Sequence, residues 1–309
     1  MDHQRALGLK FDRQAWVLGT VAKHLRRRGA SDLDAVQFET WCHAGSAGNP
    51  NARRSAAQIV HRFCRYRRRL DPTVFVPDAN HFPRRIPHRQ PVIFGPAEVS
   101  RMLRIAATYP TPRHFPLYVP AARIAVILLY TTGLRRGELA HLTLADVDLT
   151  AATLRVRESK FHKSRFVPLS CSTLAALREY LRARLAPPWD IGADTALIGH
   201  HHGTHDFKGY SMTGMSQLVR RMLHDANVCD AHGRAAHVHD FRHSFAVQAL
   251  LRWYRQGADV QAKLPQLSMY LGHVSIVSTA HYLHFIPDVA RAASRQFGRQ
   301  FGHLVGGAT

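Results

Sequence analysis

The chain has 309 residues, which is enough for two domains that each bury a hydrophobic core. Its 42 Lys and Arg outnumber its 21 Asp and Glu, which gives a formal net charge of +21. Such an excess indicates a large acidic partner, and nucleic acid is the first candidate. The alternative explanation of the charge is a generic basic protein from an Arg-rich coding background. The longest apolar run, 125–130, is too short to cross a bilayer, and the four cysteines fit neither a zinc site nor a disulfide framework.

The N-terminal part is predicted to be helical. Ser31, followed three residues later by Asp34, has the pattern of a capping box and opens a helix through Trp41. Residues 53–70 then place apolar side chains at helical spacing along one face. The other face carries Arg54, Arg62, Arg65, Arg68 and Arg69. A solvated basic face is the ordinary explanation, but so many arginines with hardly an acidic residue favour contact with a phosphate backbone.

Prolines interrupt the helical pattern between 71 and 96. They are Pro72, Pro77, Pro83, Pro87, Pro91 and Pro96, and Arg84, Arg85 and Arg89 lie among them. Prolines at this density predict a stiff, extended connection rather than a core element. We therefore predict an N-terminal helical domain over 1–75, a Pro/Arg-rich linker over 76–96 and a second domain over 97–309.

The second domain is predicted to begin with a helix that has Pro96 in its first turn. A buried helix over about 121–131 follows and ends near Gly133. Alternating residues at 153–157 and a returning run at 165–169 predict a β-hairpin, whose turn carries two lysines. The hairpin is the only clear strand pattern that we find in this part of the sequence.

The rest of the chain is predicted to be helical, apart from loops near 187–208 and 230–237. The fold class is therefore mainly α with a small antiparallel β-hairpin or sheet. The first of these loops contains the run His200-His201-His202-Gly203-Thr204-His205, which suits adventitious metal binding, DNA contact or an exposed loop without function, and we assign it no role. A last amphipathic segment, 287–304, packs either on its own domain or on a neighbouring protomer.

Two short segments place arginines at helix ends. The segment 132–139 ends a buried helix at a glycine and delivers Arg135, with Glu138 one helical turn further on. Near a helix N-terminus, His239 and Arg242 stand three residues apart and share a face, where backbone N–H groups and the helix dipole already favour an anion. A buried Arg–carboxylate pair is commonly structural, and metal binding by the histidines lacks a matched ligand set.

A third segment, 271–284, is apolar and yet carries three histidines around one tyrosine. His273 follows a glycine, and Tyr282 comes nine residues later. Local evidence favours a tyrosine that packs its ring and hydrogen-bonds its tip. The alternative is that its hydroxyl does chemistry.

Together these segments resemble the tyrosine recombinase, or phage integrase, family from about residue 97 to the C-terminus, with a weaker match to its SAM-like N-terminal region. The family's T-G-L-R-x-x-E-L box is matched at 132–139 and its H-x-L-R-H box at 239–243, with Phe in the Leu position. Its L-G-H box and nucleophile are matched at 271–273 and Tyr282. The hairpin pattern G-K-G-x-K-x-R-x-V-P-L is matched over 159–169 without its flanking glycines, so its lysine is Lys160 or, alternatively, Lys163.

The resemblance implies a two-domain DNA clamp with the tyrosine recombinase catalytic fold, and it implies six catalytic residues. These are Arg135, Lys160, His239, Arg242, His273 and Tyr282. A Tyr hydroxyl that attacks phosphorus keeps the phosphodiester energy in a covalent 3′-phosphotyrosine. Two arginines suit the negative charge on the non-bridging oxygens of the phosphate. A lysine supplies a proton to the leaving 5′-oxygen. The histidines bind the same phosphate or handle the tyrosine proton. Glu138 and His243 are expected to orient this site.

The expected DNA contacts lie in both domains and the linker. They are Arg54, Arg62, Arg65, Arg69, Arg84, Arg85, Lys163 and Arg165. The expected partner is double-stranded DNA with paired recombination sites. We expect a tetramer of this chain on the DNA and a monomer or weak oligomer in its absence. Other recombinases are further candidate partners. We expect no metal, no cofactor and no membrane partner, and a cytoplasmic, DNA-associated protein of a bacterium.

Several functions stay open at this point. A site-specific recombinase or integrase of a mobile element is favoured, and resolution of chromosome dimers in the manner of Xer recombinases is the alternative biological role. A type IB topoisomerase would share the chemistry but not the spacing of the boxes. A DNA-binding accessory protein with a recombinase fold and little turnover would not need to keep every catalytic residue.

Overall fold

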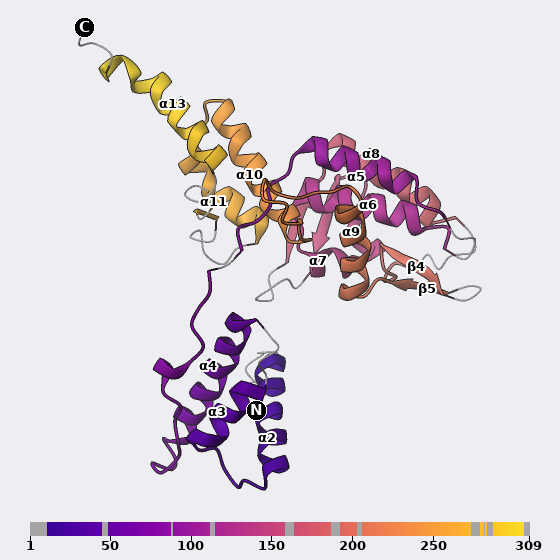
Figure 1. Cartoon of the computed structure of the whole chain (residues 1–309). Coiled ribbons are helices and arrows are strands. Elements are labelled where there is room, and N and C mark those ends of the chain that lie inside the picture. The colour runs from indigo at the N-terminus through magenta and orange to yellow at the C-terminus, as the bar shows by residue number, and fades with distance from the viewer. Residues whose placement is uncertain are drawn as a thin grey trace. The chain divides into compact units, whose positions relative to one another are not determined.

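The computed structural model describes residues 11–44, 49–87, 89–111, 115–157, 164–186, 192–202, 206–272, 279–280, 282 and 287–305 (Figure 1). The chain divides into two compact units, Met1–Arg89 and Gln90–Thr309, and each buries a hydrophobic core of its own. Helices dominate the described residues and the sheets are small and antiparallel, which confirms the predicted fold class. Within these described ranges, no helix is both long and apolar enough to cross a membrane.

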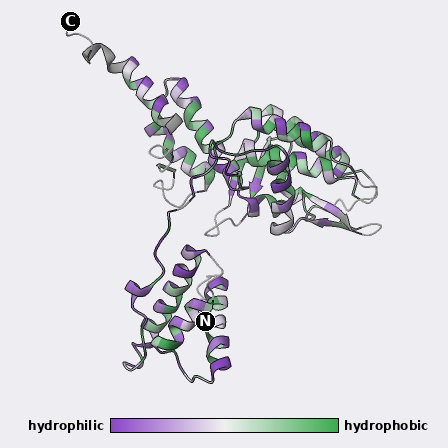
Figure 2. Ribbon diagram, in the orientation of Figure 1, coloured by the Kyte–Doolittle hydropathy of each residue, from purple (hydrophilic) through white to green (hydrophobic). Residues whose placement is uncertain are grey.

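The first unit is a small helical domain. Its elements are α2 (Asp12–Arg28), α3 (Ala35–Ala44), α4 (Pro50–Arg67) and the short 3₁₀ helix η1 (Ala79–His81). Val17 of α2, Phe38 of α3 and Val60 of α4 meet in its core, which the segment after α4 closes with Phe82. The helices carry hydrophobic residues on part of their surface and hydrophilic residues on the rest, as amphipathic packing requires (Figure 2).

The helix starts of this unit differ from the predicted ones. The helix α3 begins at Ala35 because the Asp34 carboxylate, rather than Ser31, accepts a hydrogen bond from the backbone N–H of Gln37 at 2.7 Å. The helix α4 begins at Pro50, three residues before the predicted start, because the Asn49 side chain caps it and Pro tolerates the first helical position. Short polar caps therefore fix both starts.

The second unit is built around one buried helix, α6 (Tyr118–Thr132), which contacts the short helix that follows it and four longer helices. These are α5 (Pro96–Ala107), α8 (Cys171–Arg184), α9 (Met212–Asp225) and α10 (Asp240–Arg255). Eight of the fifteen residues of α6 are buried, which is why it reads as an almost continuous apolar run. The remaining helices are α7 (Arg136–Ala140), α11 (Val260–Leu271) and α13 (Pro287–Val305), with η2 (Leu144–Asp146) before the sheet. The helix α13 packs on α10 of its own unit.

The predicted hairpin forms two strands of a three-stranded antiparallel sheet. The strands β1 (Val147–Asp148), β2 (Thr153–Val156) and β3 (Arg165–Pro168) pair in this order. In β2 and β3, Leu154 lies opposite Val167 and both are buried, whereas Phe166 points outward. The alternation therefore places Arg165 on the same side of the sheet as Val167.

A second hairpin lies where the sequence predicted only a loop. The strands β4 (Gly199–His202) and β5 (Asp206–Gly209) pair antiparallel. The guanidinium carbon of Arg184, a fully buried side chain of α8, lies 3.5 Å from the ring centroid of Phe207. This stacking depends on a distant residue, so local hydrophobic alternation did not reveal the strands.

The turn after α6 requires glycine for two reasons. Gly133 has a left-handed backbone with φ of +62°. A Cβ at this position would lie 2.7 Å from Cδ1 of Phe245 in α10 and 3.1 Å from Cδ2 of Leu271 in α11. The turn thus lets α6, α10 and α11 approach one another closely.

We expect Gly133→Ala to lower the free energy of unfolding by about 2–6 kcal/mol, because backbone strain and steric overlap each cost about 1–3 kcal/mol. Gly257→Ala is the matched control, since Gly257 has φ of +69° and nothing within 4 Å of an added Cβ. Urea unfolding of both variants measures the difference. Equal losses would mean that the overlap with Phe245 and Leu271 relaxes without cost.

Candidate active site

Arg135 is delivered by the turn at Gly133 and starts α7. Its backbone N–H donates to Oε2 of Glu138 at 2.8 Å, and its Nη1 donates to Oε1 of the same carboxylate at 2.7 Å. Its Nη2 donates to the carbonyl of Gly272 at 3.0 Å. A quarter of the Arg135 side chain stays exposed, whereas that of Glu138 is buried. The carboxylate therefore fixes both the backbone and the guanidinium of Arg135.

Arg242 lies in the first turn of α10 and is almost completely buried. It donates from Nη1 to the carbonyl of Gly133 at 2.9 Å and from Nη2 to the carbonyl of Leu271. Burial, together with the nearby charge of Arg135, lowers the pKa of Arg242 to about 10. The group is still a cation at neutral pH, and its charge is held in place by backbone carbonyls.

Arg165 is the third arginine of the cluster. Its Nη1 and Nη2 donate to the two oxygens of Glu138 at 3.0 and 2.8 Å, and its Nε donates to the carbonyl of Tyr270 at 2.9 Å. Burial opposes the charge of Glu138, but hydrogen bonds from Arg165 and Arg135 and the charge of Arg165 hold the pKa of the carboxyl below its ordinary value. One carboxylate thus faces two guanidinium groups.

Three consecutive carbonyls at the end of α11 accept from these three arginines. Tyr270 accepts from Arg165, and the next two carbonyls accept from Arg242 and Arg135. The last carbonyls of a helix have no partner within it and carry the negative end of its dipole, so they attract cations. The helix ends at Gly272, whose φ of +64° turns the chain away.

The predicted nucleophile lies beside two histidines of α10 and its cap. The hydroxyl of Tyr282 is 2.8 Å from Nδ1 of His243, and the ring of His243 meets that of His239 edge to face with centroids 4.7 Å apart. Burial raises the pKa of Tyr282 to about 12, so its hydroxyl is protonated at neutral pH. Burial, followed by the charge of Arg242, lowers the pKa of His239, which leaves this imidazole neutral at pH 7.

The structure brings together Arg135, Glu138, His239, Arg242, His243 and Tyr282, which come from three separate segments of the chain. Lys160, Lys163 and His273 lie outside the described residues. Among the residues that are described, no three His, Cys, Asp or Glu side chains gather where they would hold a metal ion. Neutral phenol, neutral imidazole and fixed guanidinium groups suit attack on a phosphodiester.

Arg165 was predicted to contact DNA, and the structure places it inside the protein, with only 12% of its side chain exposed. The pairing of Arg165 with Glu138 in the arginine cluster was not predicted from the sequence. The signal was the strand period, because Arg165 stands two residues before the buried Val167 and so faces inward.

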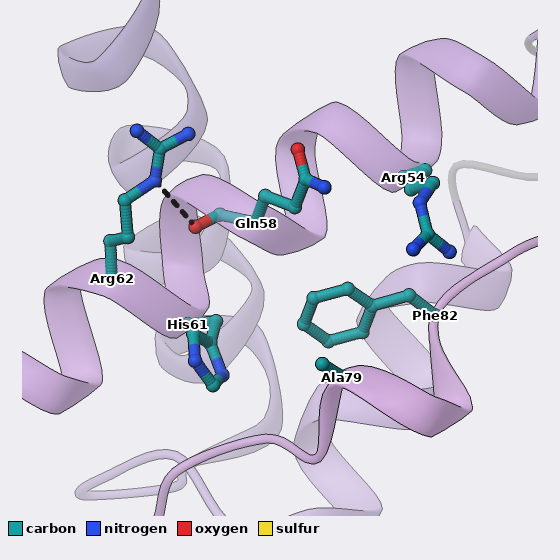
Figure 3. A pocket seen from close by; sticks show the side chains of 6 residues that line it. All are labelled: Arg54, Gln58, His61, Arg62, Ala79 and Phe82. Carbon is teal, nitrogen blue, oxygen red and sulfur yellow. Dashed lines mark hydrogen bonds between the residues drawn. The ribbon is translucent and has the colours of Figure 1, made fainter. Parts of the chain in front are cut away.

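The predicted DNA contacts of the first unit line α4 and the segment after it. A pocket of about 350 Å³ lies between them (Figure 3), lined by Arg54, Gln58, His61, Arg62, Ala79 and Phe82. Arg54 donates to the carbonyl of Pro83 at 3.0 Å and so also braces this segment. Arg65, Arg69, Arg84 and Arg85 are exposed. Basic groups thus remain available on this unit for an anionic partner.

Residues 94–287 match the phage integrase family, and the chain belongs to this family, whose tyrosine recombinases cleave and rejoin DNA. A putative integrase/recombinase, y4rB of Sinorhizobium fredii (strain NBRC 101917 / NGR234), is 31% identical over 309 residues, which are 97% of this chain and 95% of the relative. This kinship confirms the family that the sequence motifs indicated.

Solved structures show the same fold. XerH site-specific recombinase bound to palindromic difH substrate, in a post-cleavage complex, is 16% identical with a TM-score of 0.61, over 85% of this chain and 72% of that one. The Tn1549 transposon integrase in complex with transposon right end DNA is 16% identical with a TM-score of 0.60, over 91% and 98% of the two chains. The predicted tyrosine recombinase catalytic fold is confirmed.

We expect Glu138→Gln to lower the free energy of unfolding at pH 7 by about 3 kcal/mol, because two partly buried guanidinium groups lose their counter-charge. The folded-state pKa of Glu138 lies below its ordinary value of 4.5, so its stabilisation is fully present above about pH 5 and is lost as the pH falls through the folded-state pKa. The gap between wild type and variant should therefore narrow as the pH falls below about 4.5.

Denaturant unfolding at several pH values measures this gap. The control is Glu179→Gln, which removes one carboxylate from the exposed surface of α8 and should leave the unfolding free energy within about 0.5 kcal/mol of wild type. A gap for Glu138→Gln that stays constant down to pH 3 would contradict the charged, arginine-paired carboxylate.

Proposed function

We propose that the chain is a site-specific DNA recombinase that cleaves and rejoins strands through a covalent bond between Tyr282 and a 3′-phosphate. The observation that carries the proposal is the juxtaposition of the Tyr282 hydroxyl, His243 and His239 with the arginine cluster of one unit. The family membership of the chain supports the reaction class. The Tn1549 integrase of similar fold, a transposon protein, supports the finer proposal that this recombinase serves a mobile element.

In the proposed reaction the Tyr282 oxygen attacks phosphorus, and the bond from phosphorus to the 5′-oxygen breaks. The hydroxyl proton passes to a neutral imidazole, for which His243 stands at hydrogen-bond distance. Arg135 and Arg242 neutralise the two non-bridging oxygens as charge develops on them. A proton for the departing 5′-oxygen comes from Lys160 or Lys163 of the hairpin turn. Attack by the 5′-hydroxyl of a partner strand then reverses these steps and restores the phenol.

We also propose that the first unit and the second unit both bind the duplex and that a tetramer holds two paired sites. The net charge of the chain and the exposed arginines of α4 support DNA binding by the first unit. The nearly complete burial of Tyr282 supports a reaction in which DNA binding uncovers the nucleophile, since a phosphate must reach its hydroxyl.

We expect wild type to form a covalent complex with nicked suicide duplexes that cover the DNA flanking its gene, in the presence of EDTA, and Tyr282→Phe to form none. A denaturing gel of labelled DNA detects the complex. Tyr254→Phe is the control, because Tyr254 is a partly buried tyrosine near the end of α10, a separate segment from Tyr282. A covalent band with Tyr282→Phe would refute the assignment, and no band with wild type despite tight binding would favour a DNA-binding accessory protein.

We expect Arg65→Gln with Arg69→Gln to lower the salt dependence of duplex binding, the slope of log K against log salt, by about 1.8, because each lost phosphate contact removes about 0.9. Arg67→Gln is the control, since the Arg67 guanidinium is already paired with both oxygens of Asp32 at 2.6 and 2.7 Å. Titration by fluorescence anisotropy at several salt concentrations measures the slopes. An unchanged slope in the double variant would exclude these residues from the interface.

A further inference from the structure

We infer that Arg165 is a positioning residue for strand cleavage, acting through Glu138 and the end of α11 on the two arginines that receive the phosphate. The inference rests on the proposed function, because it assigns a role within that reaction. It replaces the DNA contact expected of Arg165 from the sequence.

The position of Arg165 in the sheet directs its side chain inward. Arg165 is the first residue of β3 and pairs with Val156 of β2, and it stands on the same side as the buried Val167. Only 12% of its side chain is exposed, which leaves little of the guanidinium for contact with a DNA backbone. Its hydrogen bonds go to protein groups instead.

These bonds use the whole fork of the guanidinium. Both Nη atoms meet the two oxygens of Glu138, and Nε reaches the carbonyl of Tyr270. A planar group that binds a carboxylate through two parallel bonds fixes its orientation as well as its distance. Arg165 therefore ties the sheet to α7 on one side and to the last turn of α11 on the other.

Arg135 depends on both of these ties. Its backbone and Nη1 bind Glu138, and its Nη2 binds the carbonyl of Gly272, two residues beyond the carbonyl that Arg165 holds. Arg242 binds the carbonyl of Leu271, which lies between them. A shift of the α11 end or of Glu138 therefore moves both guanidinium groups together.

Arg165 also sets how strongly Glu138 competes for Arg135. Each oxygen of the carboxylate accepts one bond from Arg165 and one from Arg135, so its charge is divided between two cations. Without Arg165 the full carboxylate charge would act on Arg135, which would then be a weaker partner for a phosphate oxygen. Arg165 therefore leaves the charge of Arg135 available for the transition state.

Glycine at position 272 fits this arrangement. A Cβ there would lie 3.0 Å from Nη1 of Arg165, so the guanidinium passes close over a backbone that carries no side chain. The left-handed φ of +64° at Gly272 and the approach of Arg165 both favour glycine. The end of α11 is thus shaped to hold this side chain.

The test is a single-turnover cleavage assay with the covalent complex as its readout, run at DNA concentrations that saturate each variant. We expect Arg165→Lys and Arg165→Gln to slow formation of the Tyr282–DNA bond by about 100-fold, while the Kd for the duplex changes by no more than about threefold, since small misplacements at a reacting centre cost rate rather than binding. Arg165→Lys keeps the positive charge, so it tests the fork geometry if Arg165→Gln fails to fold.

A double variant separates positioning from general stabilisation. Glu138→Gln with Arg165→Gln keeps an amide oxygen that can accept a hydrogen bond from Arg135 but removes the carboxylate charge that Arg165 neutralises, and we expect it to cleave at least as fast as Arg165→Gln alone. A purely structural role predicts that two lost partners are worse than one. Arg155→Gln is the matched control, because Arg155 on the neighbouring β2 pairs with Asp146, and its variant should cleave at the wild-type rate.

Each outcome decides one question. A lower rate at saturation with a Kd within about threefold of wild type, together with a double variant at least as fast as Arg165→Gln, supports positioning by Arg165. A rate unchanged at saturation, or a loss confined to Kd, overturns it and returns Arg165 to the DNA contacts. Failure of wild type to form any covalent complex would instead overturn the proposed function, because that result does not involve Arg165.

Discussion

The second unit depends on how three buried or half-buried guanidinium groups are held together against their mutual repulsion. One carboxylate, Glu138, and the three carbonyls that end α11 supply the negative charge. Neither is sufficient alone, since a single carboxylate cannot neutralise three cations and carbonyls carry only partial charge. The cluster is therefore stable only when α7, β3, α10 and the end of α11 all meet at one place.

This requirement explains several features of the chain that are far apart. Gly133 lets α6 turn tightly beside α10, so that its carbonyl reaches Arg242 while the next residues start α7. Gly272 stops α11 at the residue where the last carbonyls face the arginines. The strand β3 enters the cluster through Arg165, its first residue, which follows Lys160 and Lys163 closely in the sequence. The core is thus arranged around a charged centre and not only around apolar packing.

Candidate residues of this site could be named because the sequence resembles the motifs of the tyrosine recombinase family, and two of these motifs also have a local geometry. A glycine stop followed by Arg135, and a helix start with His239 and Arg242 on one face, each specify where a side chain points. Long-range features were not accessible in the same way. The hairpin of β4 and β5 depends on Arg184 stacking on Phe207, and the inward direction of Arg165 depends on the register of β3 against β2. The observed helix starts differ from the predicted ones by a few residues because the side chains of Asp34 and Asn49 cap the helices α3 and α4.

The electrostatics of the cluster also bear on the proposed role of Tyr282 as the nucleophile. The cations would favour ionisation of Tyr282, but burial outweighs them and keeps its pKa near 12. The buried phenol is therefore protonated at neutral pH. In the proposed reaction, a phosphodiester brings negative charge next to Arg242 and Arg135. Its binding would offset the repulsion between these two cations, which contributes to the lowered pKa of Arg242. The same charge would raise the proton affinity of the neighbouring imidazoles, and acceptance of the tyrosine proton becomes easier when the substrate is in place.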